Sequence, residues 1–212
     1  MSTPDERAAV FLQLITYLRI ALTPVVMGMV LARDPASWVA FTAALLFAFA
    51  AATDFFDGRL ARRWKQTSTL GSFLDTTADK LLVSGVLLAL VEVGRVSAWI
   101  AFVIVGRELL IMGLRSAVSA SDGIVVTPSM WGKWKATVQF VAITIAIWRP
   151  AVRIGDWYLD QWLMAGAAAI TIVSAVQYLL RFVTVLSRRD PAEPGQADPA
   201  EPGRADPSAP GR

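Results

Sequence analysis

Long apolar runs dominate this chain of 212 residues and restrict the folds that it can adopt. Short polar segments separate six such runs, at roughly residues 10–32, 38–56, 73–93, 98–118, 131–148 and 157–186. About 20 apolar residues allow a helix to cross the hydrocarbon core of a bilayer. Hydrophobic residues make up 55% of the chain and charged residues only 17%, against about 25% in soluble proteins. The sequence therefore predicts an all-α integral membrane protein with six transmembrane helices.

Basic residues are distributed unevenly between the two ends of the predicted bundle. Six spans place both termini on one side. The basic residues on that side include Arg59, Arg62, Arg63, Lys65, Arg115, Lys133, Lys135, Arg181, Arg188 and Arg189. The opposite side receives only Arg33, Arg95, Arg149 and Arg153. Because loops rich in Lys and Arg stay in the cytoplasm, we expect a multi-pass protein of the inner (plasma) membrane with both termini cytoplasmic.

The C-terminal segment has a different composition from the rest of the chain. From residue 190 onward, a unit of about eight residues rich in Pro, Gly, Ala and Asp repeats. Such a composition cannot bury enough apolar surface to fold, so residues 187–212 are predicted to form a disordered tail. Residues 1–9 then form an N-terminal cytoplasmic segment, and residues 10–186 form the membrane domain.

The chain contains neither cysteine nor histidine, which excludes several kinds of chemistry. Disulfides, thiolate nucleophiles, His-containing zinc sites and Ser-His-Asp triads all require these residues. Any reaction must rest on carboxylates, Arg, Lys, hydroxyls and bound metal. The formal net charge is +3, and its distribution fits membrane topology rather than a nucleic-acid surface, so no nucleic-acid partner is expected.

Four carboxylates lie where the second and third runs meet polar sequence: Asp54, Asp57, Asp75 and Asp79. Spacings of three and four residues put each pair on one face of a helix, and a loop of about a dozen residues between the helix ends would let the pairs converge. Four close carboxylates repel unless a cation neutralises them. Oxygen ligands alone favour a hard ion, most simply Mg²⁺, with Mn²⁺ or Ca²⁺ as alternatives. Because Mg²⁺ is usually shared with substrate phosphates, a phosphate-bearing substrate is implied.

The residues between the two carboxylate pairs suit such a substrate. Gly58 and Ala61 leave room for a ligand to approach the backbone, and Arg62 is able to hold a phosphate with two hydrogen bonds. Gly71 opens the next helix, where free backbone N–H groups attract anions. Further hydroxyl donors are Thr67 and Ser68. A single acid here is readily explained as a helix-end residue, but the joint spacing favours a site.

The stretch from Asp54 to Asp79 resembles the signature of a known family. It fits the pattern D-x2-D-G-x2-A-R-x8-G-x3-D-x3-D at all eight fixed positions over 26 residues. This is the pattern of the CDP-alcohol phosphatidyltransferase family, and the resemblance extends over about residues 14–181. It implies a six-helix membrane enzyme, usually a homodimer, that displaces CMP from a CDP-linked lipid or alcohol.

The same resemblance implies roles for the individual residues. Asp54, Asp57 and Asp75 would bind one or two Mg²⁺ ions that bridge the diphosphate of the substrate. Asp79 would approach a metal and act as the general base toward the acceptor hydroxyl. The implied contacts to the CDP-lipid are Gly58, Arg62 and Ser68, with Ala61, Thr67 and Gly71 as further candidates.

A second cluster of charges is the candidate site for the acceptor alcohol. Its residues are Arg107, Arg115, Lys133 and Lys135, which together would bind a phosphate-bearing acceptor. The surrounding sequence resembles the branch of the family that uses CDP-diacylglycerol and sn-glycerol 3-phosphate. Thr16, Arg19 and Pro24 also fit that branch. A structural alternative is that Arg107 and Glu108 pair with neighbouring helices and that the lysines mark the cytoplasmic side.

Other functions remain as alternatives at this point. Phosphatidylinositol phosphate synthase and cardiolipin synthase are the nearest within the family. A divalent-cation transporter that uses the same acids is an alternative from another class. Such a transporter would be expected to place its acids at the membrane midplane within inverted repeats, and the sequence shows neither feature.

Overall fold

The computed structural model of the chain describes residues 4–32, 37–64, 69–122 and 130–187. Within these ranges, the backbone alone is described at residues 4–12, 54–64, 69–72, 115, 117–122, 130–135, 181 and 184–187. The predicted cytoplasmic segment and disordered tail fall almost entirely outside the described side chains. Both therefore stay predictions.

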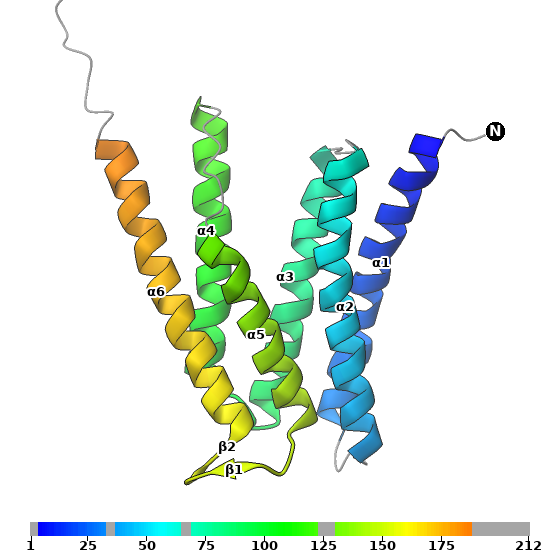
Figure 1. Ribbon diagram of the computed structural model, residues 1–212, viewed down its shortest axis with the longest axis vertical. Coiled ribbons are helices and arrows are strands. Elements are labelled where there is room, and N and C mark those ends of the chain that lie inside the picture. The colour runs from blue at the N-terminus through cyan, green and yellow to red at the C-terminus, as the bar shows by residue number, and fades with distance from the viewer. Residues whose placement is uncertain (1–3, 33–36, 65–68, 123–129, 188–212) are drawn as a thin grey trace, which may run out of the picture.

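The described ranges form six α-helices and one short hairpin (Figure 1). The helices are α1 (Pro4–Leu31), α2 (Ser37–Trp64), α3 (Thr69–Glu92), α4 (Ala98–Asp122), α5 (Met130–Trp148) and α6 (Leu159–Ser187). Strands β1 (Arg153–Ile154) and β2 (Trp157–Tyr158) pair antiparallel between α5 and α6. Gly155 in their turn has a φ of 64°, a conformation that glycine adopts without strain. The hairpin occupies part of the segment in which the sixth apolar run was expected to begin.

The prediction of a helical protein is confirmed, and the prediction of six spans is supported in part. Among the described residues, two helical segments are long and apolar enough to cross a bilayer, Gln13–Leu31 and Leu159–Leu180. Two further apolar segments are shorter, Ser37–Thr53 and Ala136–Trp148. Large apolar side chains on outward faces, such as Trp38, Leu88 and Phe102, are more than 60% exposed. Outer faces of this kind are expected for helices that contact lipid.

The prediction of a loop of about a dozen residues between the carboxylate pairs is wrong. Helix α2 continues to Trp64 and α3 begins at Thr69, so only residues 65–68 separate the two helices in the described structure. Leu, Ala and Arg, which are strong helix formers, fill most of the positions after Gly58. The polar composition of this segment therefore marks the end of an apolar helix surface and not the end of the helix. Helix α4 likewise continues to Asp122, beyond the apolar run.

Both ends of the described chain lie at the same end of the bundle (Figure 1). The start of α1, the end of α2, the start of α3, the end of α4 and the end of α6 all lie at that end. The β1–β2 hairpin and the α3–α4 connection lie at the opposite end. This arrangement agrees with an even number of helices. The assignment of one end to the cytoplasm stays a prediction.

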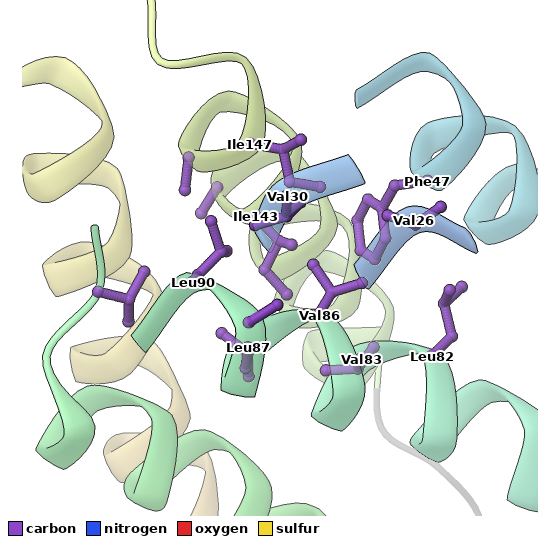
Figure 2. Close-up of a cluster of buried hydrophobic side chains, with 14 of the residues drawn as sticks. Val26, Val30, Phe47, Leu82, Val83, Val86, Leu87, Leu90, Ile143 and Ile147 are labelled. Atoms are coloured by element: carbon purple, nitrogen blue, oxygen red, sulfur yellow. The ribbon is translucent and has the colours of Figure 1, made fainter. Parts of the chain in front are cut away.

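Packing between helices buries one continuous apolar core. Helix α1 packs on α2 and α3, α5 packs on α2 and α6, and α4 packs on α3 and α6. Val26, Phe47, Leu87 and Ile143 are fully buried where α1, α2, α3 and α5 meet (Figure 2). Alanines on the inner face of α2 allow the neighbouring helices to approach closely. The core therefore anchors α2 and α3, which carry the motif, through their contacts with α1 and α5.

An arginine supports the opposite end of the bundle. Arg95, in the α3–α4 connection, donates a hydrogen bond of 2.7 Å from Nη1 to the carbonyl oxygen of Ile147 at the end of α5. A cation at a helix C-terminus stabilises the unpaired carbonyl groups there. Burial lowers the pKa of the Arg95 guanidinium, Arg149 lowers it further, and Asp160 opposes the shift. This contact joins the connection after α3 to α5.

The contact between α1 and α3 gives a test of the packing. A Cβ atom added at Gly85 would lie 2.8 Å from Met27 Sδ and 3.0 Å from Thr23 Cγ2, whereas one added at Gly28 would meet nothing within 4 Å. Gly85→Val is expected to destabilise the protein by about 1–3 kcal/mol, because overpacking displaces both neighbours. Thermal unfolding in detergent measures the change. Gly28→Val is the matched control on α1, and equal stability of the two variants would contradict the packing described.

Candidate active site

The eight motif residues lie at the ends of two consecutive helices. Asp54, Asp57, Gly58, Ala61 and Arg62 belong to the last turns of α2, of which the backbone is described beyond Thr53. The remaining three lie in α3, at Gly71, Asp75 and Asp79. Thr67 and Ser68 lie outside the described residues. Among the described side chains, no group of three carboxylates is placed to hold a metal. The side chains of Asp54 and Asp57 lie outside the described set. The four-carboxylate site therefore stays a prediction.

Asp75 is held by an arginine from α1. Arg19 is only 1% exposed and donates from Nη1 to Asp75 Oδ1 at 3.1 Å. The same guanidinium donates from Nε to the Ala50 carbonyl oxygen at 3.2 Å and from Nη2 to Thr53 Oγ1 at 3.5 Å. A buried cation is costly unless it is paired and hydrogen-bonded, and Arg19 meets both conditions. It thereby connects α1 and α2 to a predicted metal ligand on α3.

Asp79 has one paired oxygen and one unpaired oxygen. Its Oδ2 accepts a hydrogen bond of 3.0 Å from Lys80 Nζ, which also donates to Glu108 Oε2 on α4 at 2.5 Å. Its Oδ1 is buried and has no hydrogen-bond partner among the described residues. An unpaired buried carboxylate oxygen costs free energy, so such an atom in a native structure calls for an explanation. An oxygen in this state fits the role of a metal ligand or of a proton acceptor.

Arg107 occupies the interface between α4 and α6. Its Nη1 donates to Glu108 Oε1 at 2.7 Å and its Nη2 donates to Ser174 Oγ at 3.0 Å. Its Nε is buried without a partner among the described residues. The side chains of Arg115, Lys133 and Lys135 lie outside the described set, so the structure does not test whether the four cations meet. The pairing of Arg107 and Glu108 with other helices, raised as a structural alternative, is present.

Four residues of this region have no assigned role in the sequence analysis. Arg19 carried a signal, because a charged residue within an apolar run marks a candidate functional site. Lys80 follows the motif residue Asp79 and Glu108 follows the candidate acceptor residue Arg107, but sequence alone does not indicate that Lys80 and Glu108 contact each other across 28 residues. Ser174 gives no sequence signal, because a serine in an apolar helix is common.

Comparison with known proteins identifies the family. The family model for CDP-alcohol phosphatidyltransferases matches residues 11–173. The chain belongs to the CDP-alcohol phosphatidyltransferase family. Proteins from Shigella flexneri serotype 5b and Escherichia coli K12 are 38% identical to it over 170 residues, which cover 78% of this chain and 91% of each relative. Both relatives are named CDP-diacylglycerol–glycerol-3-phosphate 3-phosphatidyltransferase.

Membership places this chain among the membrane-bound transferases of phospholipid biosynthesis. Enzymes of the family generally use a divalent metal ion. The candidate metal ligands of the motif are all carboxylates, which suits such an ion. The Oδ1 atom of Asp79, which has no hydrogen-bond partner among the described residues, also fits it. The CDP-alcohol phosphatidyltransferase motif at the ends of α2 and α3 is accordingly the candidate active site.

Replacing Arg19 tests how the site is supported. Arg19→Met keeps most of the apolar volume but leaves Asp75 without its donor, and should destabilise the protein by about 1–3 kcal/mol. Arg19→Lys should recover part of this loss, because lysine retains the charge but not the planar fork of donors. Thermal unfolding in detergent is the measurement, with the exposed Arg153→Met as the charge-removal control. Wild-type stability in Arg19→Met would contradict a supporting role.

Proposed function

We propose that this protein transfers the phosphatidyl group of CDP-diacylglycerol to sn-glycerol 3-phosphate, giving phosphatidylglycerophosphate and CMP. The observation that carries the proposal is the 38% identity to relatives of that name over 91% of their length. The complete motif supports it, since all eight fixed positions are present. The proposed setting is a bacterial inner membrane, with the motif, residues 1–9 and the tail 187–212 on the cytoplasmic side. Residues 10–186 would form the catalytic domain, and the enzyme would act as a homodimer.

The proposed substrate site combines the two charge clusters. Asp54, Asp57, Asp75 and Asp79 would hold one or two Mg²⁺ ions. When bound, Mg²⁺ neutralises the charge of the diphosphate and of the departing CMP. The CDP-lipid would contact Gly58, Ala61, Arg62, Thr67, Ser68 and Gly71. The acceptor phosphate would contact Arg107, Arg115, Lys133 and Lys135.

The chain's own residues supply the proton transfer and the orientation. Asp79 Oδ1, which is buried without a protein partner in the described structure, would accept the proton of the acceptor hydroxyl. The hydroxyl oxygen then forms a bond to the β-phosphorus while the bond from that phosphorus to CMP breaks. Arg107 Nε, also buried and unpaired, is a donor for the acceptor phosphate. Reactions of this kind depend more on positioning and charge neutralisation than on covalent catalysis.

The acceptor is tested with purified protein, CDP-diacylglycerol and Mg²⁺. CMP release is expected with sn-glycerol 3-phosphate and not with inositol phosphate or phosphatidylglycerol. Replacing Mg²⁺ with a chelator should abolish release, because the carboxylates alone would repel the diphosphate. Release with inositol phosphate or phosphatidylglycerol, but not with glycerol 3-phosphate, would move the protein to another branch of the family. Cation flux in proteoliposomes without CMP release would instead support a transporter.

The role of Asp79 is tested by Asp79→Asn. The amide cannot accept the proton, so turnover should fall by at least about 100-fold, the lower range for general-base catalysis. Metal-dependent binding of CDP-diacylglycerol should persist, because the other three carboxylates remain. Turnover and binding are measured on the same preparation. Turnover near the wild-type rate would exclude Asp79 as the base.

A further inference from the structure

Glu108 connects two charged groups that the proposed reaction uses separately. Its Oε2 accepts from Lys80 Nζ on α3, and its Oε1 accepts from Arg107 Nη1. Lys80 also donates to Asp79, and Arg107 also donates to Ser174 on α6. The side chains of Asp79, Lys80, Glu108 and Arg107 are between 15% and 24% exposed. A continuous bridge of hydrogen bonds, Asp79–Lys80–Glu108–Arg107–Ser174, thus crosses three helices.

The bridge leaves two buried atoms without a described hydrogen-bond partner. Asp79 Oδ1 lies at one end of the bridge and Arg107 Nε near the other, and both are buried without a described partner. These are the atoms proposed to take the acceptor's proton and to bind its phosphate. Each charged side chain of the bridge is paired with a neighbour of opposite charge, because two cations alternate with two carboxylates. A partly desolvated network of this kind holds its members in fixed positions.

Lys80 reaches Asp79 in an unusual way. Side chains at adjacent helix positions do not face each other, yet Lys80 Nζ lies 3.0 Å from Asp79 Oδ2. The contact to Glu108 on α4 accounts for this, because it holds the ammonium group between the two carboxylates. Asp79 is thereby fixed through one oxygen while its other oxygen is left for another group.

We propose that Glu108 is a positioning residue which, through its bonds to Lys80 and Arg107, sets the spacing between Asp79 and Arg107, while Ser174 holds Arg107 from α6. The bridge would then select an alcohol whose reacting hydroxyl and phosphate are separated by that spacing. Catalytic groups held on rigid helices by supporting hydrogen bonds give the precision that such selection needs. This inference rests on the proposed function, because it takes the roles of Asp79 and Arg107 from there.

Four substitutions at three positions test the parts of the bridge separately. Ser174→Ala removes a contact of Arg107 alone and should raise the KM for glycerol 3-phosphate about threefold to tenfold, with kcat little changed. Lys80→Gln releases Asp79 and should lower kcat about tenfold or more, with a smaller effect on that KM. Glu108→Gln cannot accept from both cations and should change both constants. Lys80→Arg keeps the charge and should recover part of the lost kcat.

Two controls and one binding measurement separate positioning from stability. Thr144→Val removes a hydroxyl whose hydrogen bond in the described structure lies within α5, and Arg153→Gln removes an exposed charge in strand β1; both should leave KM and kcat unchanged. Mn²⁺ affinity, measured by electron paramagnetic resonance, should be retained in Ser174→Ala. If Glu108→Gln does not fold, Ser174→Ala and Lys80→Arg still carry the test.

The result that would overturn the inference is a set of variants with lower melting temperatures but wild-type KM and kcat. The bridge would then only join α3, α4 and α6. Failure of the proposed function has a different signature, because wild-type protein would release no CMP with glycerol 3-phosphate. If another phosphate-bearing alcohol supports turnover, the same division between KM and kcat is measured with that acceptor. If the KM and kcat effects divide in this way, the positioning role of Glu108 is supported. If they do not, the inference is overturned.

Discussion

The buried guanidinium of Arg19 is the interaction on which the carboxylate end of the bundle depends. In an apolar environment a charged group must find partners within the protein, because no water replaces them. Arg19 is 1% exposed and is bonded to Ala50, Thr53 and Asp75. These partners belong to α2 and α3, the two helices that carry the motif. One cation from the first helix therefore fixes how the motif helices face each other.

The arrangement of helices could be predicted largely from apolar runs, and the two helices that end later than expected do so for one reason. Each described helix covers most of the run that predicted it, but α2 and α4 extend into polar sequence. Apolar runs report which part of a helix is buried in lipid or protein, whereas helix length depends on backbone propensity as well. The residues after Gly58 are polar and strongly helix-forming. For that reason much of the expected loop, up to Trp64 and from Thr69 onward, is helix, and α2 continues for several residues beyond its motif carboxylates.

The candidate site could be predicted in its residue types but not in its contacts. The spacing of the motif depends on positions within one helix or two consecutive helices, which sequence periodicity reveals. The contacts Arg19–Asp75, Lys80–Glu108 and Arg107–Ser174 join residues 56, 28 and 67 positions apart. Such pairs depend on how helices pack side by side, and a single sequence does not contain that information. Ser174 illustrates the limit, because its only distinctive property is its position opposite Arg107.

Polar contacts divide the described bundle into two groups of helices joined at one point. Arg19 links α1, α2 and α3 around the motif, and Arg107 links α4 to α6. Lys80 and Glu108 connect these groups, since their ion pair joins α3 to α4. Apolar packing also joins the groups, since α3 lies against α4 and α5 lies against α2 and α6. Apolar packing is non-directional and tolerates small shifts, whereas a chain of charged hydrogen bonds fixes distances. An enzyme that must bring a lipid-linked phosphorus and a small alcohol into line needs fixed distances where its two substrate sites meet, and these charges lie between the two proposed sites.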